Sequence, residues 1–193
     1  RVAGRTLLAG MRTNTTLGIN PKGGAGKTTV ATNLASYFAN NGVATAVMDY
    51  DPQGPTMNWL RLRPVHAQRI HGANAAPQKP GLRTLGMHVP AGTQQLIIDA
   101  PAGASGLVLQ DMLSRAHCIL IPVAPSAIDI HATANFIRDL LLKGMIRQRT
   151  IRLAACAHRG RLSLPVYQPL ERFLASLQLP MLARVMDSDV AVK

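Results

Sequence analysis

Hydrophobic residues follow two alternating patterns along most of the chain. Continuous apolar runs predict buried strands at residues 15–20, 43–48, 96–99, 117–122, 151–157 and 181–185. Between them, apolar residues spaced three and four apart predict helices at residues 27–40, 106–116, 127–143 and 165–177. Strands that alternate with helices are typical of an α/β domain. We therefore expect one mostly parallel sheet with helices on both faces.

Two local predictions concern packing. In the helix at 27–40, Val30, Leu34, Tyr37 and Phe38 form an apolar stripe that we expect to face the sheet. Residues 52–95 are the least regular stretch, and only a short helix at 57–62 is predicted there. Its Trp59 is interpreted as a core residue, with an interface anchor as the alternative.

A glycine-rich segment at residues 21–29 lies between the first predicted strand and the first predicted helix. Small residues let successive backbone N–H groups converge on phosphate oxygens, and the helix N-terminus adds partial positive charge. Lys27 can then reach the β- and γ-phosphates, and the Thr28 hydroxyl can bind Mg²⁺. The expected nucleotide contacts are Gly23, Gly24, Ala25, Gly26, Lys27, Thr28 and Thr29.

The segment departs at one position from the standard phosphate-loop pattern G-x-x-x-x-G-K-[ST], because Pro21 replaces the first glycine. A second lysine, Lys22, stands at the loop entrance instead. The alternative interpretation is a glycine-rich turn with an unrelated lysine.

The run Lys-Gly-Gly-Ala-Gly-Lys-Thr-Thr at 22–29 resembles the deviant Walker A box of the ParA/MinD family of ATPases. The resemblance implies a single-domain P-loop NTPase at 15–193, after a flexible extension at 1–14. It also implies ATP and Mg²⁺ as cofactors and a homodimer with ATP sandwiched at the interface. In this family the first lysine, here Lys22, reaches across the interface to the nucleotide bound by the partner subunit.

Carboxylates follow two of the predicted strands. Asp49 and Asp51 follow the strand at 43–48, and Asp99 ends the strand at 96–99. Parallel sheets bind ligands at the carboxyl ends of their strands, so a common site is expected. The Asp-Tyr-Asp-Pro-Gln and Ile-Ile-Asp-Ala-Pro segments also resemble nucleotide motifs of the family. That resemblance implies that Asp49 and Asp99 support Mg²⁺, and that Asp51 positions the attacking water. For Asp49 and Asp51, an ordinary turn with two solvated acids is the alternative.

Two further segments resemble family motifs. Residues 121–129 are similar to the stretch that leads into the dimer-interface helix. Ser126 and Asp129 are also good helix-start residues, and we interpret them as capping residues without a catalytic role. His158 stands where relatives carry an asparagine close to the adenine base, so it is a candidate base contact. A histidine at a strand end without a ligand is the alternative.

The charge is strongly basic, with 21 Lys and Arg against 9 Asp and Glu. Residues 138–161 contain seven basic side chains and one acidic side chain. Such a field attracts polyanions, although a merely solvated basic surface is the alternative. The candidate contacts with non-specific double-stranded DNA are Arg147, Arg149, Arg152, Arg159 and Arg161.

The leading hypothesis is therefore an ATP-dependent dimer that binds DNA and positions a cargo. By resemblance, the cargo is a plasmid, a chromosome or a carboxysome-like organelle, as in the McdA branch. The partner that stimulates hydrolysis is a small ParB-like or McdB-like adaptor. The expected location is cytoplasmic and nucleoid-associated.

Other functional classes have less support. A MinD-like regulator of division-site placement needs a basic amphipathic helix at its C-terminus, and residues 187–193 do not have that pattern. No run of 18 apolar residues is present, so no transmembrane span is indicated. A membrane is not among the expected partners. An iron–sulfur carrier is rejected because Cys118 and Cys156 lie in separate apolar strands without a Cys-x-x-Cys pair. A metabolite kinase would not need Lys22.

Overall fold

The computed structural model describes residues 13–76, 87–142, 151–157, 165–179 and 181–182. The strands are β1 Asn14–Gly18, β2 Thr45–Asp49, β3 Ile70–Asn74, β4 Gln95–Asp99, β5 Cys118–Val123, β6 Arg152–Ala157 and β7 Met181–Leu182. The helices are α1 Lys27–Asn40, α2 Pro55–Leu62, α4 Gly106–Arg115, α5 Ala127–Leu142 and α6 Gln168–Ser176, with a 3₁₀ turn at Pro165–Tyr167.

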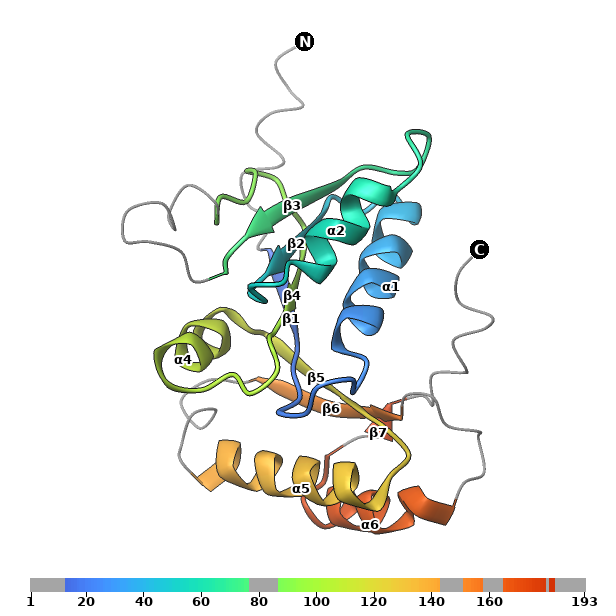
Figure 1. Cartoon of the computed structure of the whole chain (residues 1–193), viewed down its shortest axis with the longest axis vertical. Coiled ribbons are helices and arrows are strands. Elements are labelled where there is room, and N and C mark those ends of the chain that lie inside the picture. Colours follow the sequence, from blue (N-terminus) through green and yellow to red (C-terminus); the bar gives the residue numbers. More distant parts are fainter. Residues whose placement is uncertain (1–12, 77–86, 143–150, 158–164, 180, 183–193) are drawn as a thin grey trace.

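The seven strands form one sheet in the order β3-β2-β4-β1-β5-β6-β7, and all their described pairings are parallel (Figure 1). Asp99 at the end of β4 lies level with Asp49 on β2 and with Gly18 on β1. The segments that follow these three strands therefore start at the same edge of the sheet. This register brings the glycine-rich loop and the predicted carboxylates together.

Both faces of the sheet are buried, which explains why its central strands are almost continuously apolar. On one face, Ile97 packs against Ala31 and Ala35 of α1, and α2 packs beside α1. On the other face, Ile98 belongs to a larger cluster with residues of α4, α5 and α6. Neighbouring residues of one strand thus enter opposite layers, as the two-residue period of a strand requires. The predicted α/β class with helices on both faces is confirmed.

Strand β3 was not predicted, and this part of the prediction for residues 52–95 is wrong. The sequence of β3, Ile-His-Gly-Ala-Asn, has little apolar character, and only Ala73 is buried. The strand exists because β2 pairs with its backbone along five residues at the end of the sheet. Gly72 also lets α2 approach, since a Cβ there would lie 2.6 Å from Cδ1 of Leu60.

Three packing predictions also need correction. Tyr37 is 62% exposed, so it does not belong to the buried stripe, although its ring makes an edge-to-face contact with Phe38 at 5.5 Å between centroids. Trp59 is half-buried, with the Arg63 guanidinium 5.0 Å from its ring centroid, so it lies at the margin of the core. The last helix begins at Gln168 instead of 165, and Leu177 lies beyond its end and is 36% exposed.

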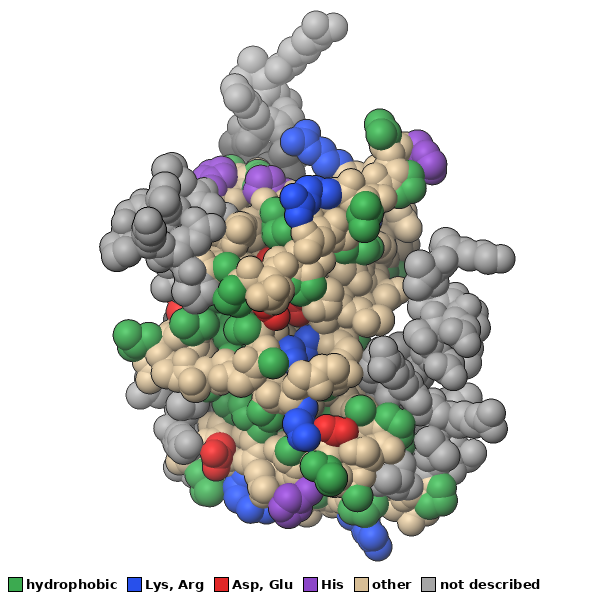
Figure 2. Space-filling view, viewed as in Figure 1, with side chains coloured by type: hydrophobic (Ala, Val, Ile, Leu, Met, Phe, Trp, Pro, Cys, Tyr) green, Lys and Arg blue, Asp and Glu red, His purple; other side chains and the backbone are tan. Residues whose placement is uncertain are grey.

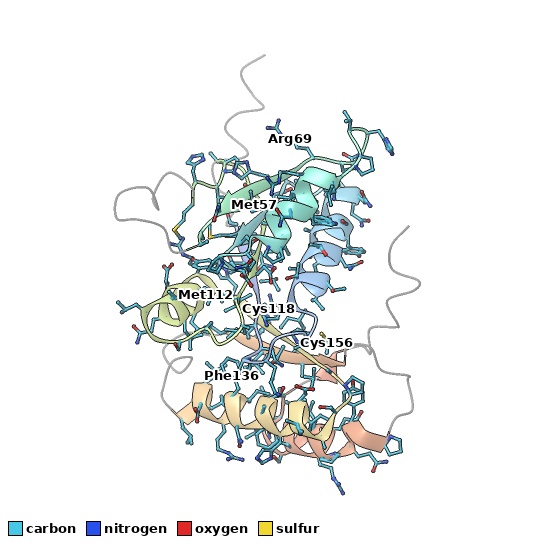
Figure 3. The ribbon with its side chains drawn as sticks, in the orientation of Figure 1. Met57, Arg69, Met112, Cys118, Phe136 and Cys156 are labelled. Carbon is cyan, nitrogen blue, oxygen red and sulfur yellow. The ribbon has the colours of Figure 1, made fainter. Side chains whose placement is uncertain are left out.

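The two cysteines are free thiols on neighbouring strands, Cys118 on β5 and Cys156 on β6 (Figure 3). Burial raises the pKa of both thiols, that of Cys156 to about 12. The Cys156 thiol is therefore protonated and unreactive near neutral pH. No helix in the described part of the chain is both long and apolar enough to cross a membrane.

Substitution of a central strand residue tests the two-layer core. Ile97→Ala should lower the free energy of unfolding by about 2–5 kcal/mol, because it leaves a cavity between β4 and α1. Leu107→Ala, at a side chain that is 82% exposed, should change it by less than about 0.5 kcal/mol. Urea denaturation followed by circular dichroism measures both, and equal effects would contradict the assigned layers.

Candidate functional site

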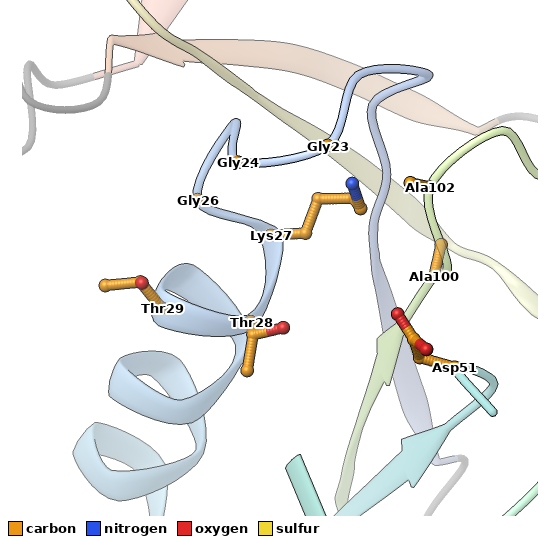
Figure 4. A pocket seen from close by; sticks show the side chains of 9 residues that line it. All are labelled: Gly23, Gly24, Gly26, Lys27, Thr28, Thr29, Asp51, Ala100 and Ala102. Carbon is orange, nitrogen blue, oxygen red and sulfur yellow. The ribbon is translucent and has the colours of Figure 1, made fainter. Parts of the chain in front are cut away.

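The glycine-rich loop leads from β1 into the N-terminus of α1 and encloses a cavity of about 240 Å³ (Figure 4). Gly24 and Gly26 have φ angles of 73° and 92°, in a region that residues with a Cβ rarely adopt. Gly26 is also the N-cap of α1 and offers no side chain to the first backbone N–H groups. Those groups and the helix dipole make the cavity suitable for an anion. Its lining consists of Gly23, Gly24, Gly26, Lys27, Thr28, Thr29, Asp51, Ala100 and Ala102.

The structure brings six of the seven predicted loop residues to this cavity. The exception is Ala25, which is 2% exposed and does not line it. Lys27 is buried, and its Nζ donates a hydrogen bond of 2.8 Å to the Lys22 carbonyl. Burial lowers the pKa of Lys27, while Asp99 and Asp51 act in the opposite direction. Lys27 and Thr28 point toward the side where Asp51 lies, whereas Thr29 points away (Figure 4).

Asp99 is the buried acid of the site, with 1% exposure. Its Oδ2 accepts hydrogen bonds from the hydroxyls of Thr28, at 2.8 Å, and Thr56, at 2.7 Å. Its Oδ1 is buried and has no hydrogen-bond partner among the described residues. Burial raises the pKa of Asp99 to about 6, although the two hydroxyls lower it. An unpartnered carboxylate oxygen next to a threonine hydroxyl fits a hard cation such as Mg²⁺.

Asp49 is fully buried beside Asp99 and holds the loop that follows β2. Its two oxygens accept hydrogen bonds from the backbone N–H groups of Asp51, at 3.0 Å, and Met57, at 3.1 Å. Burial raises the pKa of Asp49, and these N–H groups partly oppose that effect. Asp49 therefore shapes the segment that carries Asp51, and its predicted contact with Mg²⁺ stays a prediction.

Asp51 lines the cavity, and its side chain points into it (Figure 4). Its Oδ1 accepts a hydrogen bond from the Gln53 N–H at 2.9 Å, which fixes the turn. The preceding Tyr50 is fully buried and donates its hydroxyl to Asp111 of α4 at 2.8 Å. The position of Asp51 is thus set from both sides. Its predicted role in orienting water stays a prediction.

Lys22 lies at the loop entrance, and its side chain is 43% exposed. Its ammonium is 3.8 Å from Oδ1 of Asp129, in the first turn of α5. Ser126 caps this helix as predicted, because its Oγ accepts the Asp129 N–H at 3.1 Å and donates to the Asp129 carboxylate at 2.5 Å. Capping is nevertheless an incomplete account of Asp129, since this carboxylate also pairs with the loop lysine.

The sequence interpretation missed two polar residues of the site. Thr56 is fully buried and binds Asp99, and Asn20 is fully buried and binds the Lys22 N–H. No local pattern marks Thr56, because only the approach of α2 to β4 brings it there. Asn20 could have been noticed as a polar residue at the end of an apolar run.

Most of the predicted base and DNA contacts lie outside the described residues: His158, Arg147, Arg149, Arg159 and Arg161. Arg152 is described and exposed. It begins β6 and is paired with Cys118 at the start of β5. It therefore lies at the amino edge of the sheet, opposite the edge that carries the glycine-rich loop.

A parallel sheet whose first strand runs through a glycine-rich loop into a helix, with a buried aspartate on the adjacent strand, defines a P-loop nucleotide-binding domain. The profile of the family described as "CobQ/CobB/MinD/ParA nucleotide binding domain" matches residues 17–187. The chain belongs to this family.

Three curated relatives show similar sequences. Maintenance of carboxysome distribution protein A from Halothiobacillus neapolitanus is 27% identical over 118 residues, which cover 61% of this chain and 54% of the relative. Protein ParA from Rhizobium radiobacter is 32% identical over 108 residues, which cover 56% of this chain and 47% of the relative. Chromosome-partitioning ATPase Soj from Thermus thermophilus is 28% identical and covers 63% and 59%. The chain thus spans about half the length of these relatives.

Solved structures share the fold. Cobyrinic acid a,c-diamide synthase from Mycobacterium smegmatis, with bound ADP and magnesium, superposes with a TM-score of 0.71 at 18% identity, covering 93% of this chain and 89% of that one. A Cyanothece McdA–ATP complex superposes with a TM-score of 0.67 at 16% identity, covering 94% and 86%.

The buried carboxylate should make stability depend on pH. The pKa of Asp99 is about 6 in the folded chain and 3.8 in an unfolded chain, so the unfolded state binds fewer protons between these two pH values. The contribution of Asp99 to stability is therefore greatest below pH 4 and is lost as the pH rises through 6. Asp99→Asn should be more stable than the parent at pH 7.5, by up to about 3 kcal/mol, and the difference should shrink toward pH 4. Urea denaturation in EDTA measures it, and a constant difference would contradict this origin.

Proposed function

We propose that this chain is an ATPase that binds ATP and Mg²⁺, dimerises around the nucleotide and uses the dimer to position an intracellular cargo. The observation that carries the proposal is that the two lysines of the loop have different environments. Lys27 is buried in its own loop, whereas Lys22 is 43% exposed and points its ammonium toward α5. Lys22 does not line the cavity of its own chain and is partly exposed, which supports a role at the nucleotide of a second subunit once its ammonium leaves Asp129.

The residues of the chain fit this chemistry. The loop N–H groups and Lys27 would hold the β- and γ-phosphates, and Thr28, Asp99 and Asp49 would hold Mg²⁺, which neutralises phosphate charge when bound. Asp51, which also lines the cavity, would orient the attacking water. Lys22 from the partner subunit supplies further positive charge to the γ-phosphate. Phosphoryl transfer needs mainly such positioning and charge neutralisation.

The basic composition supports a polyanion as the surface that the dimer binds. Figure 2 shows Lys and Arg side chains at the end of the molecule formed by α2 and β3, whereas over the α5 and α6 layer they lie among Asp and Glu side chains. The support therefore comes from the excess of Lys and Arg in the whole sequence. We propose double-stranded DNA, bound without sequence preference, with Arg147, Arg149, Arg152, Arg159 and Arg161 as contacts. The proposed cargo is a plasmid, a chromosome or a carboxysome-like organelle, and the names of two relatives mention carboxysome distribution and chromosome partitioning. A small ParB-like or McdB-like adaptor releases the dimer by stimulating hydrolysis in the cytoplasm.

Thr56 offers a test of the cation site that leaves the phosphate loop intact. Thr56→Val removes one of the two hydroxyls that orient Asp99 and should weaken Mg²⁺-dependent ATP hydrolysis about three- to tenfold. Thr56→Ser should retain activity. Thr32→Val is the matched control, because among the described residues the Thr32 hydroxyl donates only to carbonyls of its own helix. Steady-state phosphate release against Mg²⁺ concentration measures the effect, and equal losses in both valine variants would exclude this role.

DNA binding tests the proposed function as a whole. Binding of a random-sequence duplex would be measured without nucleotide, with ADP, and with ATP plus Mg²⁺, at several salt concentrations. The parent should bind only with ATP, with log affinity falling by about 0.9 per phosphate contact for each unit of log salt. Lys22→Ala should lose the binding that depends on ATP. Arg152→Glu should weaken DNA binding and reduce the dependence of log affinity on log salt.

Arg69→Glu is the charge-matched control, because Arg69 is exposed beside β3, and β3 and β6 lie toward opposite ends of the strand order (Figure 3). If it weakens binding as much as Arg152→Glu does, then net charge rather than a specific surface is responsible. Equal binding in every nucleotide state would contradict an ATP-gated dimer. Absence of DNA binding together with ATP-dependent binding to anionic vesicles would favour a MinD-like role instead.

A further inference from the structure

A buried asparagine connects the loop entrance to α5. Asn20 lies between β1 and the glycine-rich loop and is fully buried. Its Oδ1 accepts the Lys22 N–H at 2.9 Å. Its Nδ2 donates to the Pro122 carbonyl on β5 at 2.8 Å and to the Thr133 hydroxyl on α5 at 3.1 Å. Oxygen and amide nitrogen are both satisfied, so the orientation of this side chain is determined by its partners.

Each of these contacts bears on Lys22. Its backbone N–H is held by Asn20, and its carbonyl accepts the Lys27 ammonium at 2.8 Å. Its own ammonium lies 3.8 Å from Asp129 on α5. Both parts of Lys22 are therefore connected to α5. The backbone is connected through Asn20 and Thr133, and the side chain is connected through Asp129.

We propose that Asn20 is a positioning residue for Lys22, and that α5 sets the direction of this lysine through Thr133 and Asp129. This inference rests on the proposed function, in which Lys22 acts on the nucleotide of the partner subunit. Asn20 does not line the cavity, so it acts through Lys22. The Asp129 pair holds the Lys22 ammonium on its own subunit, and Lys22 must leave this pair to reach across.

The first test is Thr133→Val, which keeps the size of a fully buried side chain and removes one acceptor of the Asn20 amide. ATP affinity would be measured on dilute protein with a fluorescent ATP analogue, and dimerisation by analytical ultracentrifugation with ATP and Mg²⁺. Thr133→Val should weaken dimerisation about five- to tenfold while ATP affinity stays within about twofold. In a Lys22→Ala background the same substitution should have no further effect.

Thr45→Val is the matched control, since Thr45 is a buried threonine of β2 whose hydroxyl, in the part of the chain that the structure describes, donates only to the nearby Val43 carbonyl. It should leave dimerisation unchanged. A similar loss in Thr45→Val, or a loss from Thr133→Val that persists in Lys22→Ala, would mean that the effect is general destabilisation and would overturn the inference.

Asp129→Asn provides a second test if Thr133→Val does not fold. It removes the ion pair with a side chain that is 22% exposed, and it keeps the backbone N–H that Ser126 accepts. Releasing Lys22 should strengthen ATP-dependent dimerisation about two- to fivefold, and only when Lys22 is present. Unchanged dimerisation in Asp129→Asn and in folded Thr133→Val would overturn this inference and leave the proposed function standing. A parent chain that stays monomeric with ATP and Mg²⁺ would overturn the proposed function and this inference with it.

Discussion

The Asp99 carboxylate is the point at which three parts of the chain meet. Thr28 at the start of α1 and Thr56 at the start of α2 donate to the same oxygen, and β4 carries the acid between them. Burial disfavours the charged carboxylate, and the two hydroxyls compensate only in part, so its pKa remains raised. The remaining buried oxygen gives a hard cation a place to bind. The start of α1, which follows the phosphate loop, and the start of α2, which follows β2, are thereby both held by the Asp99 carboxylate.

A second set of contacts extends from the loop to the opposite helical layer. Asn20 fixes the backbone of Lys22 against β5 and α5, and Asp129 holds the ammonium of the same lysine. Since the resemblance makes α5 the expected interface helix, the entrance lysine and the proposed interface would share one helix as their support. Nucleotide binding and association of two subunits would then depend on the same few hydrogen bonds.

Most of the fold could be predicted from the pattern of apolar residues. Strands such as β4 and β5 are buried on both faces, so their central residues are apolar. Helix α1 begins and ends at the predicted residues because the backbone leaves the right-handed helical region at Gly26 and Gly42, whose φ angles are 92° and 76°. Strand β3 could not be predicted, because an edge strand obtains its structure from the pairing with β2 and not from its own side chains. The prediction that Tyr37 belongs to the apolar stripe was wrong for a related reason. Helical spacing gives its position on the helix but not where the layer that covers the helix ends.

The sequence by itself determined the phosphate loop, the carboxylates Asp49, Asp51 and Asp99, and the unusual Lys22, because these depend on residue types at short spacing. Only the tertiary structure decided which groups they meet. Thr56 reaches Asp99 from 43 residues away, and Thr133 reaches Asn20 from 113 residues away. Neither contact follows from local sequence, because it is created by the packing of helices on the sheet. Asp129 is the clearest example: its capping role is local and predictable, whereas its pair with Lys22 arises only where α5 passes the loop.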